Sequence, residues 1–497
     1  MQHLRVSNRK NSHSWPRNPL LSNLPNIAFY TNLLYPKNSM FDTIKHIHIV
    51  GAGGIGVSAL VKLWLKEGKH VTGSDVNASE ITEDLVNRGL KFWEGQAPHH
   101  VSVETEVVVY SPAVPFDDQE RVRAREVGAK EYSYPEALGI LTKSYSTIVV
   151  TGTNGKSSTT AMLGLVLEAA GYDPTVIVGS LVPGWKDGNL RVGKGRFLVV
   201  EGCEHKAHIL KLYPEMIVLT NIEADHLDFY RDIDHIRETF QKFVDQLKGK
   251  GMVVWNANDI QSNRLRLGTQ VSYGLEINAD YLATGRTTHA GNQSANVSRS
   301  TPPEELGGLS LQVPGTFNLM NALAATSAAM ELGVPFETCQ RTLKAYAGIW
   351  RRFERVGSWK GVEVISDYGH HPTAVAGTID AAREFFPGHH IVLCFQPHQH
   401  SRTEKLFDDF VTSIAKADTV VLPEIYRVEG RTENEAVSSQ LLVDAIKKMS
   451  PKKPIYFAKD LNEAKEILEK IVKKDSILLI QGAGEVDRIA REIIKGQ

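Results

Sequence analysis

The sequence predicts an α/β protein with mainly parallel sheets, divided into three domains. Its 497 residues are about three times the usual length of one domain, so a single hydrophobic core is not expected. From Phe41 onward, short β-branched runs alternate with helical stretches, which is the pattern of a parallel sheet covered by helices. Two of the turns between a strand and the next helix are rich in glycine, as in sheets that bind nucleotides.

The first 39 residues differ from the rest of the chain. They contain several Arg and Lys residues, no acidic residue and no sustained period of 2 or 3.6. We expect a disordered extension or a mis-assigned start, because Met40 stands immediately before the first convincing strand. An organelle transit peptide is the alternative, although the segment has no clear amphipathic helix.

The first glycine-rich turn follows a β-branched run at residues 47–50 and precedes a helical stretch. Gly51, Gly53 and Gly56 have the G-x-G-x-x-G spacing, and Asp75 ends the next strand about twenty residues later. Such a turn lets a diphosphate approach the backbone at a helix N-terminus. The motif does not choose among NAD, FAD and a nucleotide sugar, and glycines that only allow tight strand–helix packing are the alternative.

The second turn, at residues 151–160, lies between a β-branched strand at 147–150 and a helix expected through 161–170. It reads G-x-x-G-K-S, a shortened phosphate loop. In such a loop, backbone N–H groups cradle an anion, Lys156 neutralises the β- and γ-phosphates, and the Ser157 hydroxyl ligates Mg²⁺.

Two further candidates for a metal site follow strands of the same sheet. Glu201 ends a strand at residues 196–200, and His226 lies shortly after a strand at 216–220. Because ligands bind at the carboxyl ends of parallel strands, both side chains are expected on the same edge as the phosphate loop, where they could share one magnesium ion. Taken singly, Glu201 could be a solvated acid and His226 a capping or core residue.

Four motifs together resemble the Mur ligases of peptidoglycan synthesis. They are TGTNGKS at 151–157, NIEADHLD at 221–228, DYGHHPT at 367–373 and FQPH at 395–398. The resemblance implies a UDP-sugar-binding Rossmann-like domain at 40–144, a central P-loop ATPase domain with a mainly parallel sheet at 145–350, and a C-terminal Rossmann-like domain that brings the amino acid at 351–497. Segment 276–306 has turn composition, so surface connections are expected there.

The resemblance also implies ATP-driven amide formation through an acyl phosphate, with ATP and Mg²⁺ required. It is nearest to the members that join L-alanine to UDP-N-acetylmuramate, which would be the small-molecule partners. Lys156, Glu201, His226 and His370 would be catalytic. One magnesium would be held by Ser157, and the other by Glu201 and His226. Glu204 is an acid at a family position, with no role assigned.

Binding residues follow by the same resemblance. Those implied for ATP are Gly152, Thr153, Asn154, Gly155, Lys156, Ser157, Ser158, Asn318, Asn321, Arg352 and Asp367. Those implied for the UDP-sugar are Gly51, Gly53, Gly54, Gly56, Asp75 and Ser111, and those for the amino acid are Tyr368, His370 and Arg402. Two positions depart from the family, which usually has histidine where Phe317 stands and arginine where Gln399 stands.

Three alternatives remain open from the sequence. A recycling ligase would join a murein tripeptide to the same sugar and differ mainly near His370. A nicotinamide-dependent dehydrogenase would use only the first glycine-rich turn, and a nucleotide-binding sensor would use the phosphate loop without turnover. Adjacent histidines without cysteine partners do not favour zinc.

Composition and charge exclude further classes. Lys and Arg total 56 against 57 Asp and Glu, and no local basic patch stands out, so no nucleic-acid partner is expected. No window approaches the roughly 18 apolar residues of a spanning helix, and no membrane contact is expected. The three cysteines are far apart, which is typical of a reducing compartment. We therefore expect a cytoplasmic enzyme, monomeric or homodimeric.

Overall fold

The fold was analysed in a computed structural model of the chain. It describes residues 39–227, 229–247, 249, 251–289, 291–427 and 436–496. Residues 1–38, and with them almost the whole expected N-terminal extension, lie outside this part. The described chain begins at Ser39, whose hydroxyl accepts a hydrogen bond from the Phe41 amide and caps the 3₁₀ helix η3 (Met40–Thr43).

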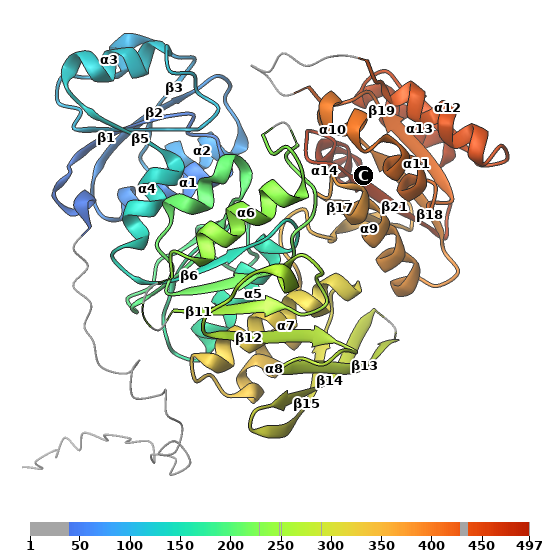
Figure 1. Cartoon of the computed structure of the whole chain (residues 1–497). Helices are drawn as coiled ribbons and strands as arrows, with labels where there is room; N and C mark the ends of the chain where they lie inside the picture. The colour runs from blue at the N-terminus through green and yellow to red at the C-terminus, as the bar shows by residue number, and fades with distance from the viewer. Residues whose placement is uncertain are drawn as a thin grey trace, which may run out of the picture. The chain divides into compact units, whose positions relative to one another are not determined.

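The first sheet lies in the blue to cyan part of the chain in Figure 1. It has five parallel strands in the order β3-β2-β1-β4-β5. The strands are β1 (His46–Val50), β2 (His70–Asp75), β3 (Lys91–Glu94), β4 (Val107–Tyr110) and β5 (Lys130–Ser133). The helices are α1 (Ile55–Lys66), α2 (Glu80–Asn87), η4 (Pro98–His100), α3 (Gln119–Val127) and α4 (Tyr134–Thr142). The order reverses at β1, and the first glycine-rich turn therefore lies where a parallel sheet leaves room for a ligand.

The second sheet has ten strands in the order β15-β14-β13-β12-β11-β10-β6-β9-β7-β8. Its strands are β6 (Ser146–Thr151), β7 (Thr175–Ile177), β8 (Leu190–Arg191), β9 (Phe197–Gly202), β10 (Met216–Leu219), β11 (Met252–Asn256), β12 (Gln270–Leu275), β13 (Tyr281–His289), β14 (Asn292–Ser300) and β15 (Pro303–Leu311). Its helices are α5 (Lys156–Ala169), η5 (His205–Lys211), α6 (Ile233–Val244), η6 (Ser262–Arg264), α7 (Thr316–Glu331) and α8 (Phe336–Lys344). Strands β10, β6 and β9 are mutually parallel, so the residues that follow them meet at one edge.

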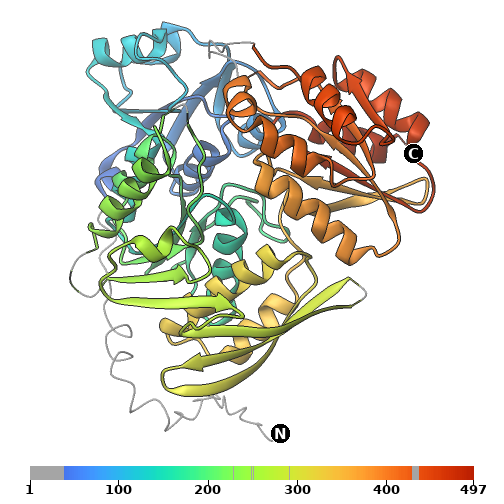
Figure 2. The same ribbon diagram turned by 45° about the vertical axis from the view of Figure 1, so that its right-hand side comes forward.

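The expectation of surface connections at 276–306 is wrong. Strands β13, β14 and β15 form an antiparallel ribbon that continues the parallel sheet, as Figure 2 shows. Alternate side chains such as Tyr281, Ala283, Ala295 and Val297 are buried in the same cluster as residues of α7 and α8. The outward positions carry Ser, Thr and Asn, and this polar face gave the segment its turn-like composition.

The third sheet has six strands in the order β16-β17-β21-β18-β19-β20, and only β16 is antiparallel to its neighbour. The strands are β16 (Glu354–Trp359), β17 (Val362–Asp367), β18 (His390–Phe395), β19 (Thr419–Pro423), β20 (Ile455–Ala458) and β21 (Ser476–Gln481). The helices are α9 (Pro372–Phe385), α10 (His400–Lys405), α11 (Phe407–Ile414), α12 (Ser439–Met449), α13 (Leu461–Ile471) and α14 (Asp487–Lys495). Separate apolar clusters cover the two faces of this sheet.

The predicted α/β class with three domains is confirmed. One apolar cluster contains Ile47 and Ile49 of the first sheet together with Val149 and Ile217 of the second. The Lys62 ammonium of α1 also donates to Asn189 Oδ1 at 3.0 Å. The first two sheets therefore share a core and a buried polar contact. The exact boundaries near residues 144 and 350 stay predictions.

Candidate active site

The phosphate loop connects β6 to α5 in a shape that only glycine permits at two positions. Gly152 has φ 133° and Gly155 has φ 84°. A Cβ atom on Gly152 would lie 2.1 Å from Thr220 Oγ1, and one on Gly155 would lie 2.3 Å from Asn321 Oδ1. The loop is thus pressed between the end of β10 and the first turns of α7.

Hydrogen bonds from the residues after β10 fix the loop further. The Asn154 amide donates to Asn221 Oδ1 at 2.9 Å, and the Thr153 amide donates to the Asn221 carbonyl at 2.9 Å. The Thr220 hydroxyl donates to the Asn154 carbonyl at 2.6 Å. These bonds hold the loop in place before any phosphate arrives, which lowers the entropic cost of binding one.

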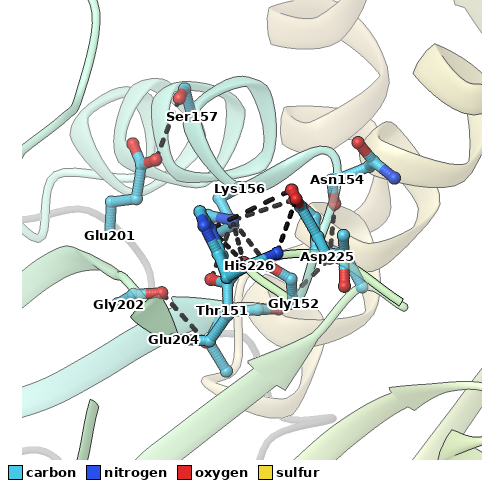
Figure 3. A network of polar contacts seen from close by, with 12 residues as sticks. Thr151, Gly152, Asn154, Lys156, Ser157, Glu201, Gly202, Glu204, Asp225 and His226 are labelled. Carbon is cyan, nitrogen blue, oxygen red and sulfur yellow. Dashed lines mark hydrogen bonds and ion pairs between the residues drawn. The ribbon is translucent and has the colours of Figure 1, made fainter. Parts of the chain in front are cut away.

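Lys156 is the first residue of α5, and its side chain folds back under the loop (Figure 3). The ammonium donates to the Gly152 carbonyl at 2.6 Å and to the Thr153 carbonyl at 2.9 Å. It also forms an ion pair with Glu204, whose Oε2 is 3.0 Å away. Burial lowers the pKa of Lys156, but the carboxylates of Glu204 and Glu201 outweigh it and raise the pKa. The lysine is therefore charged at neutral pH.

Glu201 lies at the end of β9, as predicted, and contacts Ser157. The Ser157 hydroxyl donates to Glu201 Oε1 at 3.1 Å, and the Gly179 amide donates to Oε2 at 2.8 Å. Arg352, just before β16, reaches within 3.4 Å of the Ser157 hydroxyl. Two of the three predicted metal ligands are thus in direct contact beside a guanidinium.

His226, the third predicted ligand, lies in the segment after β10 with φ 52°, a conformation that costs a non-glycine residue free energy. Its Nε2 is 3.6 Å from Glu204 Oε1, and its ring stacks on His205 with centroids 4.4 Å apart. Figure 3 shows His226 beside Lys156 and Glu204, while Glu201 approaches Ser157. The predicted pair of Glu201 and His226 therefore faces one space from two sides.

This donor set fits magnesium when substrate oxygens complete the coordination. Among the described residues, no group of three or more His, Cys, Asp and Glu side chains could hold a metal ion by itself. Magnesium is usually bound by one or two carboxylates together with phosphate oxygens and water, not by an all-protein cage. The carboxylate of Glu201 is of that kind, and the hydroxyl of Ser157 is a further oxygen donor beside it.

Two cavities meet at the loop. One of about 570 Å³ is lined by Ser157, Asn318, Asn321, Arg352 and Asp367, all predicted to contact ATP. Phe317, 40% exposed, lines it as well. The other cavity, of about 410 Å³, has on its lining Lys156, Glu201, Glu204, His226, Tyr368, His370 and Arg402. Asn154, Gly155 and Arg352 line both cavities, so the two meet at the phosphate loop. The larger cavity has the size of a nucleotide, and the smaller one is lined by all the residues predicted to be catalytic.

The residues predicted to bind the amino-acid substrate line the second cavity. One of them, Arg402, is already paired with a carboxylate of the protein. Its Nε and Nη2 both donate to Asp225 Oδ1, at 3.1 and 2.8 Å. Both side chains are buried, and a charge pair shielded from water is much stronger than one on the surface. Burial raises the pKa of Asp225, but Arg402 and the neighbouring histidines hold it well below its usual range. Among the residues that the structure describes, Nη1 of Arg402 faces weaker acceptors, the carbonyl and Nδ1 of His398 at 3.4 Å.

His370 is neutral at neutral pH. Burial is the main cause that lowers its pKa well below the ordinary value, and Arg402 adds to it. Its Nδ1 is 3.1 Å from the Tyr368 carbonyl, a contact that places the proton on Nδ1 and leaves Nε2 as the acceptor. Gln399, where the family usually has arginine, has φ 72° and lines the same cavity.

Asp367 is largely occupied by backbone contacts. Its Oδ2 accepts from the Phe353 amide at 2.8 Å, and its Oδ1 accepts from the Gly369 amide at 2.7 Å. The residue thus holds the start of β16 close to the end of β17, while its edge still lines the larger cavity.

The first glycine-rich turn is held by its own surroundings. The Gly53 amide donates to Asp75 Oδ2 at 2.7 Å. Cβ atoms on Gly51 and Gly56 would each come within 2.8 Å of a neighbour, Ser111 in one case and the Tyr134 ring in the other. Tight packing therefore explains by itself why these two positions are glycine, which is the alternative to diphosphate binding given in the sequence analysis. Packing does not require glycine at position 54, because a Cβ atom there would lie 3.5 Å or more from its nearest neighbours.

Sequence reasoning gave Glu204 no role and missed Asp225. Asp225 stands in the 221–228 motif, but its partner Arg402 is 177 positions away. Glu204 differs, because it lies three residues after Glu201 and could have been expected at the same sheet edge.

Comparison with known proteins identifies the family. Residues 46–146 match the Mur ligase family catalytic domain, 150–329 the Mur ligase middle domain, and 351–484 the Mur ligase glutamate ligase domain. The chain belongs to the Mur ligase family. The predicted resemblance is therefore confirmed, and with it the class of enzyme, an ATP-dependent ligase.

Relatives of this Mur ligase match along nearly their whole length. The UDP-N-acetylmuramate–L-alanine ligase of Geobacter sp. (strain M21) is 36% identical over 92% of this chain and 98% of its own. The enzyme of that name from Clostridium novyi (strain NT) is 35% identical over 93% of this chain and 99% of its own.

Solved structures of related ligases have a similar fold. The UDP-N-acetylmuramate-alanine ligase of Thermotoga maritima has a TM-score of 0.78 at 27% identity, covering 91% of this Mur ligase and 98% of that chain. A murein peptide ligase from Psychrobacter arcticus 273-4 has a TM-score of 0.69 at 22% identity, with the same two coverages, and shares the fold. In the part of this Mur ligase that the structure describes, no helix is both long and apolar enough to span a membrane.

Proposed function

We propose that this Mur ligase joins L-alanine to UDP-N-acetylmuramate in the cytoplasm, using ATP and Mg²⁺. The observation that carries the proposal is the meeting of the two cavities at the phosphate loop, with Lys156 and His226 on the same lining as His370 and Arg402. The relatives named for this reaction, at 35–36% identity over nearly the whole chain, support the choice of substrates.

The proposed ATP site is the larger cavity, with the γ-phosphate at Lys156 and Ser157. Asn318 and Asn321 would contact the nucleotide, Arg352 a phosphate, and Asp367 the ribose. One magnesium ion, held by Ser157, would accompany ATP. A second, held by Glu201 and His226 together with substrate oxygens, would supply charge neutralisation between the phosphates and the muramate carboxylate. The first glycine-rich turn, with Asp75 and Ser111, would hold the UDP part of the sugar nucleotide.

The reaction then has two steps. A muramate carboxylate oxygen attacks the γ-phosphorus, the bond to the β-phosphate oxygen breaks, and ADP leaves. Lys156 would neutralise the charge that develops on the transferred phosphoryl group. The amine of L-alanine next attacks the acyl carbon, and phosphate leaves with one oxygen of the former carboxylate.

His370 and Arg402 would serve the second step. An amine can attack only when it carries a lone pair, and the neutral Nε2 of His370 can take the proton that the amine loses. The Nη1 group of Arg402 is the cation available to the alanine carboxylate, since Nε and Nη2 are bound to Asp225. With Gln399 in place of a second arginine, the segment from His398 to Arg402 would offer the carboxylate one guanidinium.

Of the alternatives, the tripeptide-recycling ligase shares the proposed ATP and sugar sites and differs in the amino-acid cavity. The dehydrogenase and the sensor leave the junction of the two cavities without a task. Whether the enzyme is a monomer or a homodimer stays a prediction.

The substrate is tested by phosphate release. Purified enzyme with ATP, Mg²⁺ and UDP-N-acetylmuramate is offered a panel of amino acids and the murein tripeptide. L-alanine is expected to give the highest kcat/KM. A preference for the tripeptide would instead establish the recycling reaction, and phosphate release that does not depend on the sugar would contradict ligation.

A further inference from the structure

Glu204 is a buried carboxylate that the proposed reaction leaves without a task. It lies between β9 and η5, and only 2% of its surface is exposed. Its Oε1 is 3.2 Å from the Lys156 ammonium and 3.6 Å from His226 Nε2, so one carboxylate contacts the phosphate-binding cation and a proposed magnesium ligand. The Tyr230 hydroxyl donates to its backbone carbonyl at 2.5 Å and anchors it to the segment that follows His226.

In the structure, Glu204 and the loop together use the whole donor capacity of Lys156. An ammonium has three protons, and Lys156 has three acceptors: two loop carbonyls and Glu204. A phosphate can accept a hydrogen bond from Lys156 only if one of these three acceptors loses its hydrogen bond or shares it.

The charge of Glu204 also opposes a polyanion directly. A carboxylate paired with an ammonium is ionised, and Glu204 forms such an ion pair with Lys156. When phosphates draw on Lys156, this carboxylate loses part of its neutralisation in a site shielded from water, where charge interactions are strong. Both oxygens of this carboxylate face Lys156, with Oε1 at 3.2 Å and Oε2 at 3.0 Å from the ammonium, so its pairing depends on this one cation.

We propose that Glu204 is a positioning residue that makes nucleotide binding depend on a divalent cation. It penalises phosphates that arrive alone, because it competes for Lys156. It favours phosphates that arrive with magnesium, because the metal brings positive charge of its own and the phosphates then depend less on the charge of Lys156. This inference rests on the proposed ATP and magnesium sites, but not on which amino acid is ligated.

The test measures ADP affinity by calorimetry, in Mg²⁺ and in EDTA, for the wild type and for Glu204→Gln. Glutamine keeps the shape and an oxygen for Lys156 but removes the charge. ADP binding in EDTA is expected to become about fivefold tighter or more, and the gain on adding Mg²⁺ to shrink by a similar factor, which is the usual size of coupling between two sites. Glu204→Asp retains the charge and is expected to keep most of the magnesium gain.

A matched control is Glu331→Gln. Glu331 is the last residue of α7, about 20 Å along that helix from Asn318, and accepts a hydrogen bond from Tyr281 that glutamine can also accept. It removes one carboxylate from the same domain and should leave both affinities unchanged. Melting temperatures identify any variant that is not folded.

The proposal would be overturned if Glu204→Gln bound ADP in EDTA as weakly as the wild type or more weakly, and if Mg²⁺ still increased its ADP affinity by the wild-type factor. The proposal would also be overturned if Glu204→Asp lost as much of the magnesium-dependent increase in ADP affinity as Glu204→Gln does. The shape of the side chain, and not its charge, would then be responsible. Absence of ADP binding by the wild type would refute the proposed function itself, whereas normal coupling with an unexpected amino-acid preference would leave this inference standing.

Discussion

Replacing Lys156 with alanine is expected to lower turnover by about 10²- to 10³-fold, the usual loss when one preorganised charge partner of a transition state is removed. The ammonium lies under the phosphate loop, where the γ-phosphoryl group would gain charge during transfer. The measurement is the steady-state rate of phosphate release with all three substrates at saturation.

The same substitution should also lower the melting temperature, because Glu204 is left buried without its main cation. The double variant Lys156→Ala with Glu204→Gln should regain the melting temperature but not the activity. Lys211→Ala lies in the same domain as Lys156, removes one partner of an exposed ion pair with Glu136 of α4, and serves as the control. Near-normal turnover by Lys156→Ala would contradict the assignment of the phosphate loop.

Replacing His226 with alanine is expected to reduce formation of the acyl phosphate by about 10²-fold, while ATP affinity changes little. The proposed magnesium offsets repulsion between the muramate carboxylate and the γ-phosphate, an effect of several kcal/mol, and roughly 3 kcal/mol corresponds to that factor. ATP affinity should persist because the loop, Lys156 and Ser157 are untouched.

Two readouts separate these effects. ATP affinity is measured by calorimetry, and the acyl phosphate is trapped by borohydride reduction with the sugar present and no amino acid. His289→Ala, which removes an exposed histidine at the end of β13, is the control. Unchanged trapping in His226→Ala would return His226 to a structural role, and equal losses in both readouts would place it in the ATP site.

Much of the fold could be predicted because its signals are local. Parallel strands buried on both faces, such as β6 and β21, appear as short β-branched or aliphatic runs, and glycines mark the turns that follow β1 and β6. The ribbon of β13, β14 and β15 was missed because its outward face is as polar as a loop. Only the register with its neighbours shows which side chains face inward.

The site was predictable where one sheet edge gathers residues from successive strands, as with Lys156, Glu201 and His226. The contacts of Arg402 could not be predicted, since Asp225 belongs to another sheet and competes for the same guanidinium that the amino acid would use. The neutral state of His370 was equally hidden, because it depends on burial and on Arg402.

The most direct test of acyl-phosphate ligation follows an oxygen label. UDP-N-acetylmuramate carrying ¹⁸O in its carboxylate is converted with ATP, Mg²⁺ and L-alanine, and the released phosphate is analysed by mass spectrometry. Attack of the carboxylate on the γ-phosphorus predicts one ¹⁸O atom in each phosphate formed from fully labelled substrate. Phosphate without label would show that water, not the muramate carboxylate, attacks ATP, and would contradict the proposed reaction.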